Sequence, residues 1–254
     1  MNRTTDAVAP TRQECDAVAP QHKDSDAVAP TRQECDAVAP DGSPVEVFAR
    51  LPAQPAAGYV LAAVPDGSDV LELGCGAGRL TRALTDAGHH VVAVDESPAM
   101  LDRVPADAER VLADAAALDL GRSFPAVLLA SYLVNDPDRG AAFLAVAARH
   151  LAPGGRVVAQ RYDPTWVECA QPGEATVGPV TIAVTRLVPG PHHRFEATVA
   201  YSVDGHRWEQ EIAAAVLDDE ALEALAADAG LTIAPWLDEH RTWAVLTPRP
   251  AGDG

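Results

Sequence analysis

The sequence predicts an α/β domain in which helices cover both faces of a largely parallel sheet. Three observations support this fold class. Short apolar runs alternate with helix-compatible segments between residues 69 and 161. Several of these runs end in glycine, aspartate or serine, which places such residues at the carboxyl ends of strands, where α/β proteins bind ligands. Residues 195–203 instead alternate apolar and polar side chains, which predicts an antiparallel addition.

The first forty residues are a tandem repeat. Asp-Ala-Val-Ala-Pro occurs four times with a period of ten, and its copies end at Pro10, Pro20, Pro30 and Pro40. One valine per unit gives too little apolar surface for a core, and the regular prolines interrupt helices. We therefore expect a disordered tail over residues 1–40 and a folded domain over residues 41–254.

The first half of the domain contains the alternating elements. A helical segment over residues 45–64 is interrupted by Pro52 and Pro55. The apolar runs predict strands over residues 69–73, 90–94, 110–113, 124–130 and 156–161. The segments between them predict helices over residues 79–87, 98–103 and 138–151, the last followed by a Pro-Gly-Gly turn.

The second half predicts strands inserted over about residues 178–216. A strand over residues 180–188 precedes a hairpin whose turn is Asp204-Gly205. A two-residue loop sets Tyr201 opposite Trp208 and Ala197 opposite Ile212. A helix over residues 218–229 and an antiparallel pair over residues 231–237 and 242–247 then complete the domain.

Charge and lysine content exclude several functions. A formal net charge of −18, without a basic run, argues against nucleic acid as a partner. The only lysine is Lys23, inside the repeat tail. It follows His22 rather than a glycine, so the phosphate loop that needs Gly-Lys is excluded. Schiff-base catalysis would have to use this tail residue.

The remaining composition indicates an intracellular protein that does not span a membrane. No stretch approaches the roughly 18 consecutive apolar residues of a membrane-spanning helix, and the start of the chain lacks the pattern of a secretory signal. Four cysteines do not make a disulfide framework, so we expect a cytoplasmic protein. Cys15, Cys35 and His22 are too widely spaced for a metal site, and we expect no bound metal.

Polar and glycine residues at the predicted strand ends describe a nucleoside pocket. Gly74, Gly76 and Gly78 allow a tight turn and close approach of a ligand to backbone amides at a helix start. Asp95, at the end of the second strand, can accept hydrogen bonds from both hydroxyls of a ribose. Asp114, after the third strand, can accept from an exocyclic amine such as that of adenine, and Ser131 falls at the fourth strand end.

These residues also carry a family resemblance. The segment Val70-Leu-Glu-Leu-Gly-Cys-Gly-Ala-Gly-Arg-Leu80 resembles the first signature motif of class I S-adenosylmethionine-dependent methyltransferases. Val91-Val-Ala-Val-Asp95, Asp114-Ala115 and Leu151-Ala-Pro-Gly-Gly-Arg-Val157 are similar to its later motifs. The resemblance covers about residues 45–247. It implies a Rossmann-like seven-stranded methyltransferase sheet carrying the inserted antiparallel strands.

The resemblance also implies a cofactor, S-adenosyl-L-methionine, and roles for individual residues. The three glycines would lie along its methionine part, with Glu72 near the amino end. Asp95 would hold the ribose, Met100 would pack on the adenine, and Asp114 with Ala115 would receive the adenine amine. The helical segment over residues 45–64 would form a lid.

The acceptor is expected to be a small molecule. After the fourth strand the chain reads Ser131-Tyr-Leu-Val-Asn-Asp136, without the Asn/Asp-Pro-Pro-aromatic signature of nucleic-acid amine methyltransferases. Tyr132, Asp136 and His193 are candidate catalytic residues, although positioning supplies most of the acceleration in methyl transfer. The acceptor, the atom methylated and the oligomeric state stay open.

Two other functions remain possible from the sequence. One is a nucleoside-binding module without catalysis. The other is a nicotinamide-dependent oxidoreductase, although Arg79 stands where its Gly-x-Gly-x-x-Gly motif needs the last glycine. Methylation of the chain's own repeat tail is a further hypothesis.

Overall fold

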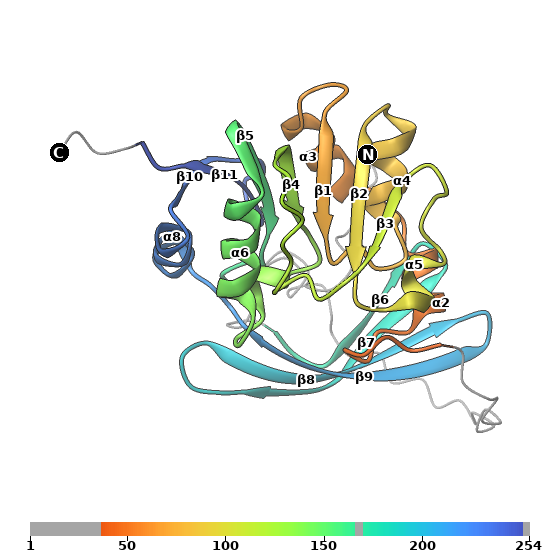
Figure 1. The fold of residues 1–254 in the computed structure, drawn as a ribbon. Coiled ribbons are helices and arrows are strands. Elements are labelled where there is room, and N and C mark those ends of the chain that lie inside the picture. The colour runs from red at the N-terminus through yellow and green to blue at the C-terminus, as the bar shows by residue number, and fades with distance from the viewer. Residues whose placement is uncertain (1–36, 166–169, 251–254) are drawn as a thin grey trace, which may run out of the picture.

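A computed structural model describes residues 37–165 and 170–250. Its larger sheet has seven strands in the order β10-β11-β5-β4-β1-β2-β3 (Figure 1). The strands are β1 (Asp69–Leu73), β2 (His90–Asp95), β3 (Glu109–Leu112), β4 (Phe124–Leu129), β5 (Leu151–Gln160), β10 (Leu231–Trp236) and β11 (Trp243–Pro248). β11 runs antiparallel to both of its neighbours, β5 and β10, and the other pairs in this sheet are parallel. The predicted fold class is confirmed.

Helices cover both faces of this sheet because its central strands are apolar on both sides. On one face, Leu71 and Val127 pack with Leu144 and Leu222 of the helices α6 (Gly140–Arg149) and α8 (Asp219–Asp228). On the other face, Val70 and its neighbours pack against the helices α3 (Ala56–Ala63), α4 (Arg79–Asp86) and α5 (Pro98–Leu101).

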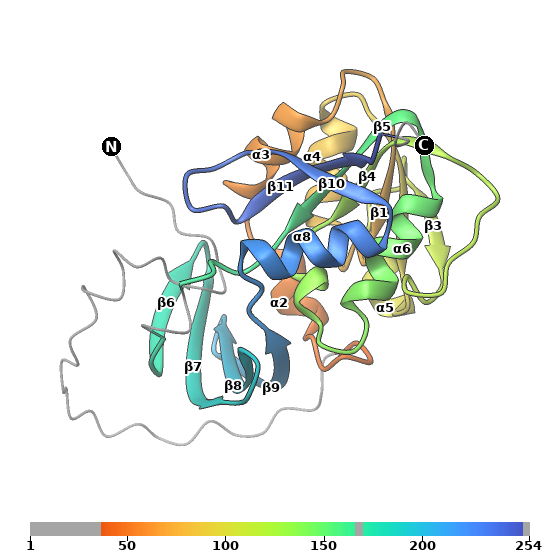
Figure 2. The same ribbon diagram turned by 90° about the vertical axis from the view of Figure 1, so that its left-hand side faces the viewer.

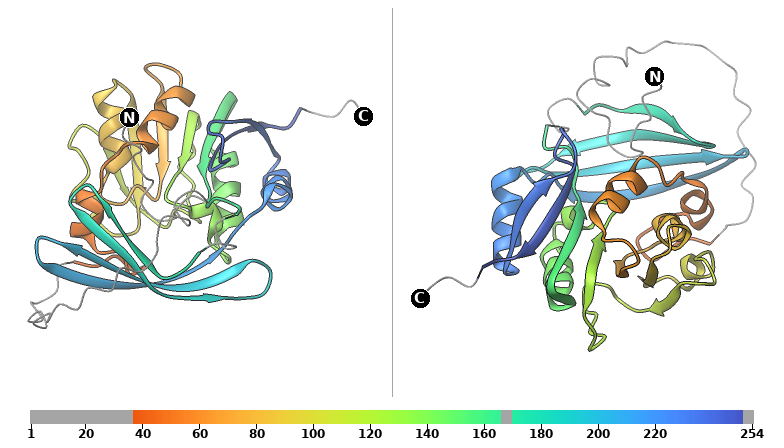
Figure 3. Two further views of the ribbon diagram at one scale, coloured as in Figure 1. Left: turned by 180° about the vertical axis from the view of Figure 1, so that it is seen from behind. Right: turned by 90° about the horizontal axis from the view of Figure 1, so that it is seen from above.

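A second sheet of four antiparallel strands lies across the carboxyl ends of the first. Its order is β6-β7-β8-β9, and its strands are β6 (Gly173–Val177), β7 (Val180–Pro189), β8 (Arg194–Val203) and β9 (His206–Ala215). Figures 2 and 3 show this sheet as a separate layer, with β8 and β9 passing beneath the edge where β1 and β4 end. Tyr201 pairs with Trp208 and Ala197 with Ile212, which confirms the predicted register.

Three element predictions differ from the structure. Strand β6 was not predicted, because most of its side chains are exposed and show no alternation. The predicted helix over residues 138–151 is shorter, since α6 ends at Arg149. The Pro-Gly-Gly segment lies inside β5 and not before it, and the pairing with β4 shifts register there.

The N-terminal part of the domain begins within the last repeat. Residues 1–36, most of the predicted tail, lie outside the described residues. Residues 37–40 are described, and Ala39 is buried. The segment predicted as a broken lid consists of two short helices, α2 (Val45–Arg50) and α3, with Pro52 and Pro55 between them. Within the described ranges, every helix is too short or too polar to cross a membrane.

Candidate functional site

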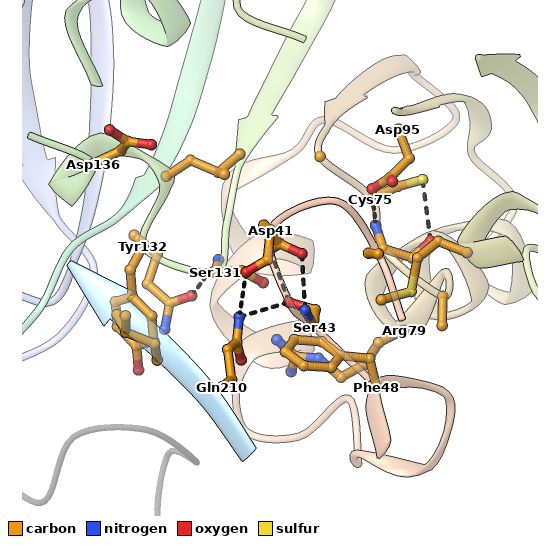
Figure 4. Close-up of a pocket in the computed structure, with 18 of the residues that line it drawn as sticks. Asp41, Ser43, Phe48, Cys75, Arg79, Asp95, Ser131, Tyr132, Asp136 and Gln210 are labelled. Atoms are coloured by element: carbon orange, nitrogen blue, oxygen red, sulfur yellow. Dashed lines mark hydrogen bonds between the residues drawn. The ribbon is translucent and has the colours of Figure 1, made fainter. Parts of the chain in front are cut away.

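A cavity of about 330 Å³ lies between the two sheets, where β1, β2 and β4 end. Its walls come from the N-terminal segment, the loops after these strands, and the facing strands β8 and β9. The predicted site residues that line it are Gly74, Gly76, Asp95, Met100, Ala115, Ser131, Tyr132 and Asp136. Figure 4 shows the labelled side chains converging on one space.

The glycine loop connects β1 to α4 and has backbone angles that favour glycine. Gly76 has φ 54°, and a side chain built there would meet no atom within 4 Å, so its backbone borders open space. Gly78 has φ 77°, and a Cβ there would approach Val104 Cα at 3.0 Å. Gly76 therefore gives a ligand access to the backbone, whereas Gly78, which does not line the cavity, allows close packing.

Asp95 is tied to this loop through its carboxylate. Gly76 N donates to Asp95 Oδ2 at 2.8 Å, and Ser97 N donates to Oδ1 at 2.9 Å. Burial raises the pKa of Asp95, the two backbone hydrogen bonds oppose this shift, and the charge of Asp41 adds to it. The sequence predicted that the glycine loop and Asp95 meet, because adjacent parallel strands end at one edge.

Two predicted residues lie beside the cavity without lining it. Glu72 is buried within β1 and accepts a hydrogen bond from Thr81 Oγ1 at 2.6 Å, and burial raises its pKa to about 7. The carboxylate of Asp114 forms an ion pair with Arg139, and its Oδ1 accepts from Ala116 N at 2.8 Å. Asp114 was expected to receive an adenine amine, and this role stays a prediction beside the observed ion pair with Arg139.

The loop after β4 and the chain after β5 each bring one aromatic ring to the cavity, Tyr132 and Tyr162. Ser131 and Tyr132 have φ 53° and 63°, a left-handed backbone that non-glycine residues rarely adopt. Ser131 N donates to Gln160 Oε1 at 2.9 Å. The ring of Tyr132 stacks on Tyr162, with centroids 4.1 Å apart and planes 5° apart. Burial raises the pKa of the Tyr162 hydroxyl, so this group stays protonated.

Asn135 holds this loop to the second sheet. Its side chain is buried, Nδ2 donates to Ala215 O at 2.7 Å, and Oδ1 accepts from Tyr162 N at 3.1 Å. Asn135 therefore connects the loop after β4, the chain after β5 and the end of β9. It fixes the position of the stacked tyrosines.

The three catalytic candidates occupy different surroundings. Tyr132 and Asp136 line the cavity, and Asp136 Oδ1 accepts from the amides of Asp138 and Arg139, both at 2.9 Å. His193 is exposed on the turn between β7 and β8 and does not line the cavity. The geometry therefore brings Tyr132 and Asp136 together and leaves His193 outside.

The sequence reasoning missed a polar network on the opposite wall. Gln210 Nε2 donates to Asp41 O at 3.2 Å and to Ser43 Oγ at 3.1 Å, and Gln210 Oε1 accepts from Tyr201 Oη at 2.9 Å. One signal was available, because Gln210 interrupts the otherwise apolar face formed by Trp208, Ile212 and Ala214 of β9. The placement of Asp41 and Ser43 had no comparable signal.

Acidic side chains outnumber basic ones around the cavity. Those that line it are Asp41, Asp95, Glu96, Asp136 and Glu211, against Arg79 and Arg139. Arg139 forms ion pairs with Glu96, which lines the cavity, and with Asp114, which lies beside it. The local charge therefore favours a cationic occupant. Among the described residues, no group of three or more His, Cys, Asp or Glu side chains could hold a metal ion.

The residues present fit a nucleoside. The open backbone at Gly76 allows a ligand to approach closely. The half-buried Asp95 carboxylate offers an acceptor for hydroxyls, and the apolar Met100 and Ala115 offer a surface for a base. The cavity volume is within the range of about 300–1,000 Å³ that is common for small-molecule sites.

Comparison with known proteins agrees with this description. Residues 70–155 match the family model of a methyltransferase domain. The chain is also similar to the cypemycin N-terminal methyltransferase of a Streptomyces species, with 38% identity over 107 residues. This match spans 39% of the present chain and 44% of that relative.

Solved structures resemble the chain over more of its length. The sugar N-methyltransferase from a Streptoalloteichus species has a TM-score of 0.62 at 21% identity, over 89% of this chain and all of that one. A SAM-bound amino pentose methyltransferase from Micromonospora echinaspora has a TM-score of 0.57 at 26% identity, over 78% of this chain and 90% of that one.

Proposed function

We propose that the protein is an S-adenosylmethionine-dependent methyltransferase of class I that methylates a small-molecule amine, a proposal supported by the match of residues 70–155 to the family model of a methyltransferase domain. The observation that carries the cofactor assignment is the contact between Gly76 N and Asp95 at the edge of the cavity. It places an open backbone and a hydroxyl-accepting carboxylate side by side.

Cofactor residues are proposed on the same geometry. Gly74 and Gly76 would border the methionine part, Asp95 would accept from the ribose hydroxyls, and Met100 with Ala115 would contact the adenine. Glu72 and Gly78 would act by shaping the glycine loop. Arg79, whose Nη1 donates to Pro52 O at 3.2 Å, adds positive charge to this wall for a carboxylate.

Bound S-adenosylmethionine supplies an electrophilic methyl group on a sulfonium. The residues of this chain orient the acceptor and keep water out, which are the main contributions to a displacement reaction. The Tyr132–Tyr162 stack forms an aromatic wall next to the loop that carries Asp136. Asp136 and Asp41 lie at the same cavity and can stabilise a cationic amine or take its proton.

A nitrogen acceptor is supported by two features. The acidic lining attracts ammonium groups, and two similar proteins are described as an N-terminal and a sugar N-methyltransferase. We accordingly propose two acceptor classes for testing, the α-amine of a peptide and the amine of an amino sugar. We also propose a cytoplasmic location, which the low cysteine content supports.

Calorimetric titration with S-adenosylmethionine tests the cofactor assignment. We expect a micromolar dissociation constant, equivalent to about 8 kcal/mol, and at least roughly tenfold weaker binding in Asp95→Asn because a charged acceptor is lost. Asp119→Asn is the matched control, since this exposed carboxylate also caps a backbone amide, that of Gly121. Unchanged binding in Asp95→Asn would contradict the assignment, and Asp114→Asn shows whether Asp114 contributes.

The acceptor class is tested by mass spectrometry after incubation with cofactor. We expect a mass gain of one or more methyl groups on an amine from one of the two classes. Transfer to a hydroxyl acceptor and not to the matching amine would overturn the nitrogen assignment while leaving the cofactor assignment intact.

A further inference from the structure

The end of the fourth repeat and the residues after it form a tight turn that lines the cavity. We call residues 39–43 the strap. Ala39 N donates to Ser43 O and Gly42 N donates to Ala39 O, both at 2.9 Å, and Val38 pairs with Pro44 just outside it. Ala39, Asp41 and Ser43 line the cavity. The strap is thus a part of the cavity wall that is held in shape by its own backbone.

The strap has one small apolar anchor on the proposed cofactor side. Ala39 packs with Ala77 of the glycine loop, with Met100 of α5 and with Val45. An alanine side chain buries little apolar surface, so this contact alone holds the strap weakly.

Hydrogen bonds to the second sheet hold the other side of the strap. Gln210 on β9 donates through Nε2 to both Asp41 O and Ser43 Oγ, and Ser43 Oγ in turn donates to Asp41 Oδ2 at 2.8 Å. Gln210 is 8% exposed, and its Oε1 is oriented by the hydroxyl of the buried Tyr201. Such a buried network is strong while complete and costly when one member is missing.

This network lies between the two halves of the site. In Figure 4, Asp41, Ser43 and Gln210 lie between Tyr132 with Ser131 on one side and Asp95 with Cys75 on the other. The strap therefore borders the glycine-loop half of the cavity and is hydrogen-bonded to β9, the strand whose Ala214 packs with Tyr162 on the other half.

We propose that Gln210 is a positioning residue that latches the strap across the cavity, so that the strap must detach from β9 before the cofactor enters or leaves. The proposal rests on the proposed function for the identity of that cofactor. The latch also links the two sheets. Strand β9 belongs to the second sheet and faces the acceptor side, and through Gln210 it holds the strap against the cofactor side.

The residues that follow the fourth repeat differ from those that follow the earlier copies, as a specific contact with Gln210 requires. Ala-Val-Ala-Pro recurs upstream, but the earlier copies are followed by Thr-Arg-Gln or Gln-His-Lys. Only the fourth copy is followed by Asp-Gly-Ser, and Gly42 has φ 88°, a conformation that an arginine or histidine at the matching position would strain. The residues that meet Gln210 therefore follow only the fourth copy of the repeat.

Hydrogen exchange measured by mass spectrometry tests the latch without any ligand. The variant pair is Gln210→Leu, which removes the donor, and Gln210→Leu with Tyr201→Phe, which also removes the tyrosine hydroxyl left without a partner. Glu209→Gln is the control on the same strand, since Glu209 is exposed and contacts Arg207. We expect peptides covering residues 37–45 to exchange roughly tenfold faster in both Gln210 variants, with α6 unchanged.

Release of labelled S-adenosylmethionine, chased with unlabelled cofactor, tests the coupling. We expect a roughly tenfold higher dissociation rate in the Gln210 variants and in Ser43→Ala, and a wild-type rate in Glu209→Gln. Unchanged exchange of residues 37–45 overturns the latch, and faster exchange with unchanged cofactor release overturns its gating role. A protein that binds no S-adenosylmethionine contradicts the proposed function instead, and the exchange experiment still decides the latch.

Discussion

Glu72 is a buried carboxyl group with few neighbours that stabilise its ionised form. It is 3% exposed, its hydrogen bond comes from the neutral hydroxyl of Thr81, and the nearby Asp95 opposes its ionisation. Arg79 offsets this only in part, so burial prevails and the pKa rises from 4.5 to about 7. The glycine loop is therefore built next to a group that changes charge near neutral pH.

This shift predicts a pH-dependent stability that Glu72→Gln removes. Because the folded pKa is raised, the folded state holds a proton that the unfolded state has already lost between pH 4.5 and about 7. The protonated carboxyl of Glu72 therefore adds on the order of 3 kcal/mol to the free energy of unfolding. This contribution is complete below pH 4.5 and is lost as the pH rises through 7.

Urea unfolding of the wild type and Glu72→Gln across this range measures the difference. We expect the free energy of unfolding of the wild type to fall more steeply with pH than that of the variant. Asp95, whose pKa is also raised, is present in both proteins, so its contribution cancels apart from its repulsion with Glu72. Parallel profiles would show that Glu72 ionises as an ordinary surface glutamate.

Residue positions were predictable where one rule of sheet geometry determined them. Gly76 and Asp95 end neighbouring strands, so their meeting followed from the order of elements. The direction of Asp114 depends instead on Arg139, which lies 25 residues further along the chain. His193 was a candidate because loops can face a pocket, and only the tertiary arrangement shows that its turn does not.

At the scale of elements, one side chain fastens four segments together. The guanidinium of Arg161 is buried at the end of β5 and donates to Arg241 O and Leu217 O, each at 2.8 Å. It also forms an ion pair with Asp219 at the start of α8 and lies over the ring of Trp236, 4.3 Å from its centroid. The fork geometry of arginine suits this arrangement, and a lysine cannot reproduce it.

Arg161→Lys is therefore expected to lower the free energy of unfolding by about 3 kcal/mol, because buried acceptors lose their donors. Arg122→Lys is the matched control. Arg122 also pairs with a carboxylate, that of Glu109, and lies over Phe124, but both charged groups are exposed. We expect that variant to change stability by less than about 1 kcal/mol.

Urea denaturation of both variants makes the comparison. Equal losses in the two proteins would mean that burial of Arg161 adds nothing beyond a surface pair.

Element boundaries were predictable where the alternation of side chains was strong. They were poorly predicted where pairing with a neighbouring strand determines them. The register of β8 and β9 followed from their alternation and the Asp204-Gly205 turn. The edge strand β6 has little apolar character, so only its pairing with β7 identifies it. The Pro-Gly-Gly segment has the residues of a turn, but it belongs to β5 because that strand pairs with β4 on both sides of it, with a shift in register.

At the scale of the whole molecule, negative charge predominates. The formal net charge is −18, and the cavity has the same sign as the surface. Such a field raises the local concentration of cations and weakens with added salt.

The Michaelis constant of a cationic amine acceptor should therefore rise between low ionic strength and about 0.5 M salt, where charges are screened within a few ångströms. That of an uncharged acceptor should change little. Steady-state kinetics with one acceptor of each kind measures this contrast, and Glu211→Gln should reduce the salt effect because it removes one exposed charge at the cavity. Identical salt profiles for both acceptors would rule out steering by the cavity.

Arg161 also joins the two ends of the segment that forms the second sheet. Its contacts to Leu217 and Asp219 bring together the two points where the second sheet leaves and rejoins the chain. The segment between residues 162 and 216 therefore begins and ends close to the same side chain, Arg161. A different segment with the same span between its ends can replace this one without changing the glycine loop or Asp95, so the part of the cavity wall that faces them can vary as a unit.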